Sequence, residues 1–500
     1  MVGTCHSAAP VGVSARLVEV EVDVRDGRPE IAFVGLPDAA VREARDRVRT
    51  ALVNAGYRFP GRKVTVNLAP ADLRKEGSAY DLPIAIGILV ATGQVRAPRA
   101  ADHLLVGELA LDGRLRPVRG ALCVADRAAR SGRWRGLLVP RENAGEAALA
   151  GGLPVYAVET LAEAVRFLSG ATDLVAARPP DAPTAAPGAA TDFADVRGQE
   201  GAVRAALLAA AGGHHLLLVG APGSGKTMIA ERLPGILPAL CPAEAIEATK
   251  IHSVAGVLRG PSVPRPPYRA PHHTVSPAGL LGGGPRAAPG EITLAHRGVL
   301  FLDELPEFDR RSLEGLREPL ERGEVAVARA GYRVRFPSRF LLVAACNPCA
   351  CGNHGVPDRD CSCSPREVER YRARISGPLL DRFDLQVRVP AVKAASLAAD
   401  APRGFSSADL RAAVAAARAA QASRGVPNAS LDGKVLDRLA PLDREGEAFL
   451  ARAAERLRFS ARAHVRVRRL ARTIADLAGG GPVLRAHLAE AVSFRLRGDG

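Results

Sequence analysis

Residues 214–230 read HHLLLVGAPGSGKTMIA, and this stretch decides the fold of the main part of the chain. The apolar run 216–219 is predicted to form a strand that is buried on both faces. The segment GAPGSGKT matches the P-loop pattern, whose glycines let the backbone approach phosphate oxygens while exposed N–H groups supply a positive field. Lys226 is expected to reach the β- and γ-phosphates of ATP, and the Thr227 hydroxyl to bind Mg²⁺. The predicted nucleotide-binding residues are Gly220, Ala221, Pro222, Gly223, Ser224, Gly225, Lys226 and Thr227.

A second apolar run ends in two adjacent carboxylates. Residues 298–302 read GVLFL, and Asp303 and Glu304 follow directly. Asp303 is expected to hold the Mg²⁺ shell, and Glu304 to polarise the attacking water as the general base. Paired acids at a strand end can also serve only as helix caps. Their occurrence downstream of a P-loop favours an ATPase site.

The composition indicates a multidomain protein with a polyanionic partner. A chain of 500 residues suggests two to four domains, and the 47% hydrophobic content allows sizeable cores. The net charge is +15, and residues 451–500 carry 11 arginines against 4 acidic residues. This balance favours nucleic acid, although a general arginine bias is the alternative. No signal peptide opens the sequence and no apolar run reaches membrane-span length, so a cytoplasmic protein without a membrane partner is expected.

The chain divides by pattern into an α/β multidomain protein. Residues 1–175 mix α and β patterns and contain no phosphate loop. Residues 176–191, rich in Pro and Ala and without periodicity, are predicted to be a linker. The ATPase domain is assigned to 192–392, and a helical domain to 393–500. Within 1–175, strands are predicted at 18–24, 64–68, 104–106 and 137–140, and helices at 38–56 and 81–90.

Five of the eight cysteines are clustered between residues 346 and 363. Within this insert, 346–363, the pairs Cys349-x-Cys351 and Cys361-x-Cys363 could converge on one tetrahedral Zn²⁺. The loop between the pairs, residues 353–358, has little to bury and would gain from a metal clip. Free reduced thiols or a redox switch are the alternatives. His354 could replace one thiolate, and Cys346 lies in an apolar strand and is interpreted as core.

Several further segments are not explained by generic ATPase chemistry. Residues 268–274 read YRAPHHT and residues 289–296 read PGEITLAH. Together with the motifs above they resemble the YifB/ComM family of magnesium-chelatase-like AAA+ ATPases, and the match runs from VGLP at 34–37 to ARTIAD at 471–476. The resemblance implies a Lon-protease-like α+β fold for 1–175, an AAA+ P-loop α/β domain for 192–392 and a helical lid for 393–500.

The resemblance also implies two further catalytic residues. Asn347 ends the apolar strand 340–347, where AAA+ proteins carry the sensor-1 residue that orients water against the γ-phosphate; alternatively it only begins a turn. Residues 376–384, SGPLLDRFD, resemble the arginine-finger segment of magnesium-chelatase and MCM-type proteins. Arg382 would then enter the ATP site of a neighbouring subunit and stabilise the transition state. Arg374 is the second candidate, and a surface ion pair of Arg382 with Asp381 or Asp384 is the alternative.

The segment Ser460-Ala461-Arg462 is similar to the sensor-2 pattern. Arg462 would then contact the γ-phosphate, with Arg466 as the second candidate. Both residues and Arg469 lie at helical spacing on one face of the predicted helix. The alternative is a solvated basic face.

Members of this family are hexameric DNA motors that migrate three- and four-stranded branches during natural transformation. The resemblance implies the same activity for this chain. It also implies that the chain forms a homohexamer and binds branched or single-stranded DNA. Residues 323–336 are predicted to form a hairpin around Ala330-Gly331. In relatives this hairpin faces the central pore, and so does the helix-2 insert, which here would contain Arg269, His272 and His273. The alternative is that these exposed loops are merely solvated. The candidate DNA contacts are Arg269, His272, His273, Arg329, Arg333 and Arg335.

Two other functions remain open at the level of sequence. A magnesium-chelatase-like subunit that couples ATP hydrolysis to metal insertion into a tetrapyrrole would share the same ATPase core. An ATP-dependent protease would need a Ser78–Lys75 dyad in the amino-terminal domain. A loop entering a helix, with Ser78 or Asp81 as the N-cap, explains these residues better.

Overall fold

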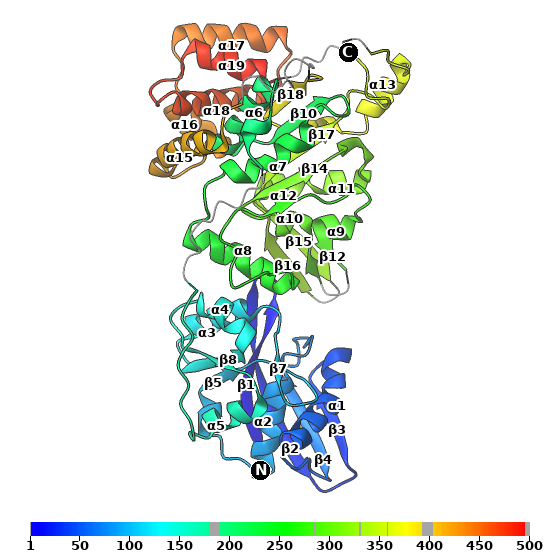
Figure 1. Cartoon of the computed structure of the whole chain (residues 1–500), viewed down its shortest axis with the longest axis vertical. Helices are drawn as coiled ribbons and strands as arrows, with labels where there is room; N and C mark the ends of the chain where they lie inside the picture. The colour runs from blue at the N-terminus through cyan, green and yellow to red at the C-terminus, as the bar shows by residue number, and fades with distance from the viewer. Residues whose placement is uncertain are drawn as a thin grey trace. The chain divides into compact units, whose positions relative to one another are not determined.

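The computed structural model describes residues 2–180, 191–284, 287–329, 332–357, 359–392 and 404–495 (Figure 1). The chain forms two compact units. The amino-terminal unit comprises Met1–Thr184 and Cys241–Pro264, and the carboxy-terminal unit comprises Ala185–Leu240 and Arg265–Gly500. Most of the predicted linker, residues 181–190, lies outside the described residues.

The amino-terminal unit is built on a seven-stranded mixed sheet of order β3-β4-β2-β1-β5-β8-β9. Its long strand β2 alternates buried and exposed side chains, as the sequence predicts for a half-buried strand. The strands and helices predicted for this region are confirmed, with ends that differ by a few residues. The strands are β1 Gly3–Val11, β2 Ser14–Arg25, β3 Glu30–Val34, β4 Lys63–Ala69, β5 His103–Leu105, β6 Glu108–Leu109, β7 Leu115–Arg116, β8 Gly136–Pro140 and β9 Val155–Val158.

Two helices show how this unit closes its core. α1 (Ala39–Asn54) is amphipathic and begins at Asp38, whose side chain accepts a hydrogen bond from the Val41 N–H at 2.8 Å. α2 (Asp81–Ala91) is apolar on every side and almost wholly buried, as expected of a central helix. The remaining helices are α3 Ala121–Ser131, α4 Arg141–Ala148 and α5 Leu161–Leu168.

The helix α8 (Pro242–Ala255) packs within the amino-terminal unit although it follows the P-loop in sequence. Its Ser253 hydroxyl accepts a hydrogen bond from the Gly120 N–H at 2.9 Å, and its Lys250 pairs with Asp126 at 2.9 Å. The sequence-based domain assignment instead runs continuously from 192 to 392. Local periodicity cannot reveal this grouping because α8 is held by residues more than a hundred positions earlier.

The carboxy-terminal unit contains a five-stranded parallel sheet of order β11-β14-β17-β10-β18. Its apolar strands form a core with α6 (Glu200–Gly212) and α7 (Lys226–Ile236). The strands are β10 Leu216–Gly220, β11 Tyr268–Arg269, β14 Val299–Leu302, β17 Leu341–Cys346 and β18 Leu385–Val389. Since all five run in one direction, the sheet has a carboxyl edge, where the strands end, and an amino edge, where they begin. β17 lies between β10 and β14, as the sequence predicts for the strand that ends at Asn347.

A second layer of short elements follows β11 and β14 in sequence. The predicted hairpin is present as β15 (Glu324–Arg329) and β16 (Tyr332–Pro337), with Val327 opposite Val334. Its turn, Ala330-Gly331, and the side chain of Arg329 lie outside the described residues. The other elements of this layer are α9 Pro277–Leu281, β12 Gly282–Gly283, β13 Ala288–Pro289, α10 Glu291–Leu294, α11 Arg310–Gly315 and α12 Arg317–Arg322.

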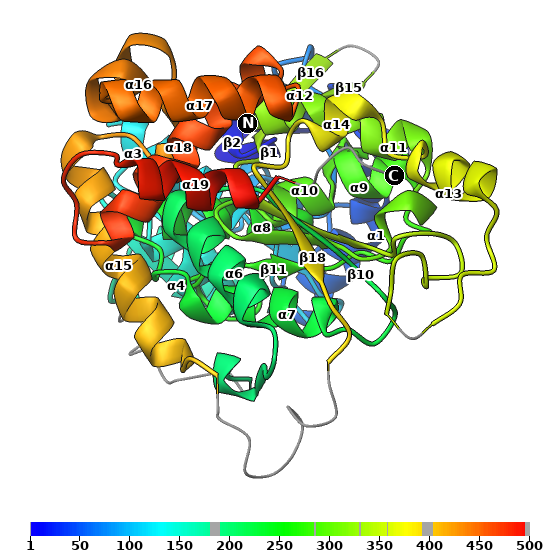
Figure 2. The same cartoon turned by 90° about the horizontal axis from the view of Figure 1, so that it is seen from above.

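The end of the chain is helical, as predicted. Figure 2 shows α15–α19 gathered on one side of β10 and β18, with α13 on the other. The Ser460 side chain caps α18 by accepting a hydrogen bond from the Ala463 N–H at 3.2 Å. The helices are α13 Pro365–Arg372, α14 Gly377–Leu380, α15 Ser407–Arg424, α16 Gly433–Leu439, α17 Arg444–Arg456, α18 Ala461–Leu477 and α19 Arg485–Ser493. Among the described residues, no helix combines the length and the hydropathy that crossing a bilayer requires.

Candidate active site

The P-loop connects the end of β10 to the start of α7. Gly223 and Gly225 have φ values of 75° and 90°, a left-handed conformation that glycine adopts without a steric penalty. The buried Lys226 ammonium donates hydrogen bonds to the carbonyls of Gly220 and Ala221 at 2.8 and 2.9 Å. Burial lowers the pKa of Lys226. The loop therefore has the phosphate-cradling shape that its sequence predicts, with the lysine folded across it.

Two predicted Mg²⁺ ligands meet beside this loop. The Thr227 hydroxyl donates to an Asp303 carboxylate oxygen at 2.8 Å, although the two residues come from α7 and from the end of β14. A hydroxyl and a carboxylate are oxygen ligands of the kind that Mg²⁺ binds, so the residues present fit the ion. Bound there with ATP, Mg²⁺ would offset the negative charge of the phosphates.

Glu304 follows Asp303 and is about half exposed. Its backbone is left-handed, with φ 52°, and its N–H donates to an Asp303 carboxylate oxygen at 2.9 Å. Its own carboxylate lies 3.3 Å from Nδ1 of His273. The sequence suggested His273 as a DNA contact, and its proximity to Glu304 was not predicted because the two residues belong to different strand-to-helix connections.

Asn347 completes the group at the carboxyl edge. Its side-chain oxygen accepts a hydrogen bond from Lys226 at 3.3 Å, which places it beside the P-loop as its sensor assignment requires. The preceding residue, Cys346, is buried in β17, and burial raises the pKa of its thiol to about 12. Cys346 is therefore a core residue, as the sequence predicts.

Arg382 lies at the other edge of the sheet. It comes just before β18, whose first residue, Leu385, pairs with Leu216 at the start of β10. A strand of this length spans about 16 Å, and the P-loop begins at its far end. Arg382 is buried and pairs with Glu321; among the described residues neither Asp381 nor Asp384 is its ion-pair partner. Arg374, the second finger candidate, pairs with Glu307 at 2.8 Å.

A buried polar network, missed by sequence reasoning, anchors the Arg382 segment. Asp384 contacts His214 Nδ1 at 3.4 Å and Arg466 Nε at 3.3 Å, and His214 Nε2 contacts the Thr473 hydroxyl at 2.7 Å. Burial alone would raise the pKa of Asp384, but the hydrogen bond from His214 and the surrounding positive charges outweigh it and lower the pKa to about 2. This network ties the amino edge of the sheet to α18.

The network also locates the sensor-2 candidates. Arg466 is buried on Asp384, and Arg462, one helical turn earlier in α18, is exposed. Arg469 donates to the Leu431 carbonyl, so a fully solvated basic face is wrong for this helix. Since Arg466 lies at the amino edge, we expect neither α18 arginine to reach the P-loop of its own chain.

The candidate DNA contacts have different surroundings. Arg269 forms a bidentate pair with Glu291, in which its Nε and Nη2 donate to the two carboxylate oxygens at 2.6 and 2.7 Å. His272 is exposed. Arg333 and Arg335 lie on the exposed face of β16, and Arg335 is 3.3 Å from Glu324 across the hairpin.

Comparisons with known proteins cover nearly the whole chain. Models described as subunit ChlI of Mg-chelatase, as magnesium chelatase subunit ChlI, and as its C-terminal part match residues 20–143, 192–397 and 404–495. The competence protein ComM of Haemophilus influenzae is 45% identical over 98% of this chain and 96% of its own length. The protein YifB of Escherichia coli is 44% identical over the same shares, 98% and 96%.

The chain belongs to the YifB/ComM family of magnesium-chelatase-like proteins. A more distant relative, an MCM-type protein of Methanocaldococcus jannaschii, is 29% identical over 34% of this chain and 19% of its own length. The family assignment agrees with the P-loop, the paired carboxylates and the helical end of the chain. The Lon-like fold of the amino-terminal unit stays a prediction.

In this family member the suggested Ser78–Lys75 dyad is not assembled. The Ser78 hydroxyl donates to Glu108, and the buried Lys75 ammonium donates to the Pro70 carbonyl. Asp81 is the first residue of α2 and accepts hydrogen bonds from Arg47 at 2.8 and 3.1 Å. Ser78 therefore contacts a carboxylate and not the Lys75 amine, so the serine–lysine pair that a Lon-type protease would need is not formed.

The four predicted metal-ligating cysteines do converge. The sulfur atoms of Cys349, Cys351, Cys361 and Cys363 lie within 4.8 Å of one another, and three of the separations are 3.3, 3.5 and 3.7 Å. A disulfide would require about 2.05 Å. Four thiolates bound to one zinc at about 2.3 Å lie about 3.8 Å apart, so these residues fit a zinc ion. His354 contributes its backbone N–H to Cys349 and not a side-chain ligand.

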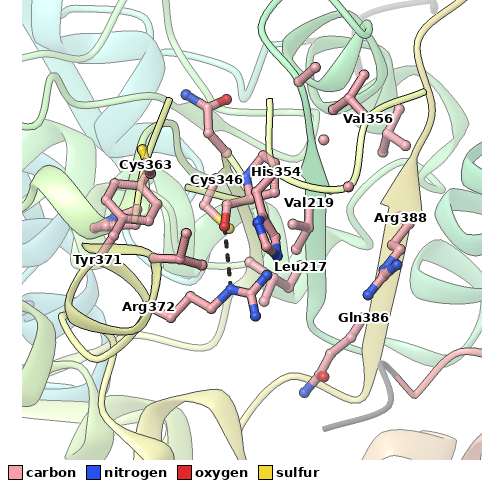
Figure 3. A pocket seen from close by; sticks show the side chains of 18 of the residues that line it. Leu217, Val219, Cys346, His354, Val356, Cys363, Tyr371, Arg372, Gln386 and Arg388 are labelled. Carbon is pink, nitrogen blue, oxygen red and sulfur yellow. Dashed lines mark hydrogen bonds between the residues drawn. The ribbon is translucent and has the colours of Figure 1, made fainter. Parts of the chain in front are cut away.

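A cavity of about 970 Å³ lies between the face of β10 and β18 and the cysteine loop, by which we mean the connection 349–363 that carries the four converging cysteines (Figure 3). Its wall includes the P-loop residues Gly220 and Ala221, and Arg372 of α13 donates to the Pro348 carbonyl there at 3.3 Å. Gln386 and Arg388 of β18 line the opposite wall. The cysteine loop and the P-loop therefore border one cavity, a neighbourhood that the sequence does not reveal.

The Asp384 network leads to a stability prediction. Asp384→Ala leaves His214 and Arg466 buried without their shared partner, so we expect a loss of about 3–5 kcal/mol in the free energy of unfolding at pH 7. Asp381→Ala, three residues earlier and partly exposed, should cost under about 1 kcal/mol. Urea unfolding followed by circular dichroism measures both.

The pH dependence gives an independent check of the same network. The folded-state pKa of Asp384 is lowered, to about 2 from an ordinary 3.8, so its stabilising contribution is present above pH 4 and is lost as the pH falls toward 2. The difference between the parent and Asp384→Ala should narrow over that range. A difference that stays constant down to pH 2 contradicts the assignment.

Proposed function

We propose that this protein is an ATP-driven DNA motor that works as a ring of identical subunits and migrates branched DNA. The observation that carries the proposal is the division of the catalytic groups between the two edges of one parallel sheet. Lys226, Thr227, Asp303 and Asn347 gather at the carboxyl edge, whereas Arg382 lies at the amino edge. A site divided in this way is complete only where two subunits meet.

The nucleotide-binding edge supplies the chemistry of ATP hydrolysis. Lys226 would exchange the P-loop carbonyls for phosphate oxygens, and Glu304 would orient and polarise the attacking water. Asn347 would hold that water against the γ-phosphate. Arg382 of a neighbouring subunit would stabilise the negative charge that develops on the transferred group, as arginine fingers do in other P-loop enzymes.

DNA as the partner is supported by charge and by the relatives. The chain carries a net charge of +15, which favours a polyanion. The exposed Arg333 and Arg335 of the β15–β16 hairpin would contact backbone phosphates, which fix the position of the protein on DNA without reading its sequence. The relative from Haemophilus influenzae is named a competence protein, and a distant relative is MCM-type.

The function is tested by branch migration on a synthetic Holliday junction. The parent protein with ATP should separate the junction into duplex products and should hydrolyse ATP faster when DNA is added. Lys226→Ala should lose nucleotide binding, and Glu304→Gln should bind ATP but hydrolyse it at least about 100-fold more slowly, because it lacks the base. A parent protein that ignores DNA but responds to a tetrapyrrole-binding partner would favour the chelatase alternative.

If each ATP site is shared by two subunits, rings that mix two different inactive variants should regain ATPase activity. Arg382→Ala and Glu304→Gln subunits should each be nearly inactive alone. In a one-to-one mixture, about a quarter of the interfaces join an intact P-loop edge to an intact arginine, so ATPase activity should reappear. Mixing Lys226→Ala with Glu304→Gln is the matched control and should restore nothing, because both changes damage the same edge. An Arg382→Ala protein with the parent's ATPase rate contradicts the arrangement.

We also propose that Cys349, Cys351, Cys361 and Cys363 hold one structural zinc ion. Purified protein should contain about one zinc per chain by plasma mass spectrometry. Cys349→Ala should lose the metal and lower the temperature of unfolding, because the ion closes the loop between β17 and α13. Cys346→Ala, three residues away and buried in the core, should keep the metal. Full zinc occupancy in Cys349→Ala would refute the four-cysteine assignment.

A further inference from the structure

One end of the amino-terminal sheet gathers basic side chains. β2 ends there while β3 and β4 begin there, and the pairing of these strands puts both Arg25 and Glu30 opposite Lys63. The two connections at this end therefore lie side by side, and Arg62 Nε of one is 3.4 Å from an Asp26 carboxylate oxygen of the other. The chain begins at the same end of the sheet (Figure 1).

The connection between α1 and β4 is held by side-chain hydrogen bonds to its backbone. The Arg58 N–H donates to Gln94 Oε1 and the Arg58 carbonyl accepts from Gln94 Nε2, both at 2.8 Å, so the backbone is fixed while Arg58 stays exposed. The guanidinium of Arg49, near the end of α1, lies 5.6 Å from the centre of the Phe59 ring in this connection. The cations of this surface, the basic end, are Arg25, Arg28, Arg49, Arg58, Arg62 and Lys63.

Most of the charge at the basic end is not compensated by a carboxylate. Arg25 pairs with Asp23, and Arg62 with Asp26. The other cations are exposed, and within the described part of the chain they have no ion-pair partner; they are Arg28, Arg49, Arg58 and Lys63. Exposed positive charge concentrated in this way attracts a polyanion.

The opposite end of the same strands is different. Arg16 of β2 lies 3.4 Å from Asp72, and Arg74, which follows β4, lies 3.7 Å from Glu76. An arginine that already has a carboxylate partner gives up that interaction when it binds a phosphate. The unpaired cations therefore single out one end of the sheet and not the amino-terminal unit as a whole.

The aromatic side chains of the basic end point to a duplex and not to a single strand. Tyr57 and Phe59 pack against the apolar core of the unit. Single-stranded nucleic acid is commonly held by open aromatic rings on which its bases stack, and rings packed inward do not offer that contact. Long exposed Arg and Lys side chains instead suit phosphate oxygens, which position a protein on DNA without reading its sequence.

We propose that the basic end binds the phosphate backbone of duplex DNA, as a second DNA contact in addition to the β15–β16 hairpin. This inference rests on the proposed function, because it names where a duplex arm of the branched DNA is held. Each unpaired cation would neutralise a phosphate and release its counterions. The contact needs neither ATP nor a particular base sequence, so it persists through every step of the ATPase cycle.

The test compares two double variants of the full chain. Arg28→Gln with Arg58→Gln removes two unpaired cations from the basic end, and Arg16→Gln with Arg74→Gln is the matched control at the opposite end. Fluorescence anisotropy without ATP measures binding to a duplex of about 30 base pairs. At about 0.15 M salt the first variant should bind at least about tenfold more weakly than the parent, with a salt slope reduced by at least about two. The control should bind as the parent does.

A second measurement locates the duplex on the parent protein and does not depend on how any variant folds. Lysines are acetylated by a soluble reagent, and the modified positions are read by mass spectrometry. Duplex DNA should slow the acetylation of Lys63 severalfold. The exposed Lys434 of α16 is the control within the same molecule, and its acetylation should be unchanged.

Equal duplex affinities of the two double variants overturn the inference, as does acetylation of Lys63 that the duplex does not slow. Binding to phosphatidylglycerol vesicles that the Arg28/Arg58 variant loses, while its DNA binding is intact, would assign the basic end to a membrane surface and also overturn it. Failure of the proposed function looks different: the parent binds the duplex through the basic end, but DNA neither stimulates its ATPase nor is migrated at a junction.

Discussion

The parallel direction of the strands in the carboxy-terminal unit is the constraint on which the site depends. Because β10, β14 and β17 all end at one edge, three separate segments deliver Lys226, Asp303 and Asn347 to one place. The same geometry sends the residues before β10 and β18 to the opposite edge. A functional residue of this unit therefore lies at the amino edge if it precedes its strand and at the carboxyl edge if it follows its strand.

Each edge is then fixed by buried polar contacts rather than by apolar packing alone. At the amino edge, Asp384 joins His214 to Arg466, and none of the three is left solvated. Removing one partner from such a group costs more free energy than the intact pair contributes to stability, because the other partner is left buried without compensation. The arginine-finger role proposed for Arg382 requires a well-fixed side chain, since misplacement of a transition-state group by 1 Å is costly.

The sequence predicted those features of the fold and the site that depend on residues close together in the chain. The P-loop glycines, the apolar run before Asp303 and the capped helix after Ser460 follow from neighbouring residues, and the strand order placed Asn347 correctly. The contact of His273 with Glu304 was beyond reach because it depends on which strands pair. For the same reason α8 could not be assigned by pattern to the amino-terminal unit, and the burial of Arg466 could not be distinguished from the exposure of Arg462.

The cysteine loop, which is the connection between β17 and α13, also bears on the carboxyl edge of the sheet. It begins two residues after Asn347 and ends at Ser364, the cap of α13, and α13 returns Arg372 to the Pro348 carbonyl. The loop therefore closes on the same short segment that carries the sensor candidate. A connection of this length with few apolar side chains has little of its own to order it, and the proposed zinc ion would supply that order through the four sulfur atoms. The proposed metal would then also fix the position of Asn347, which lies two residues before the first of these cysteines, so the geometry of the carboxyl edge would depend on a site outside it.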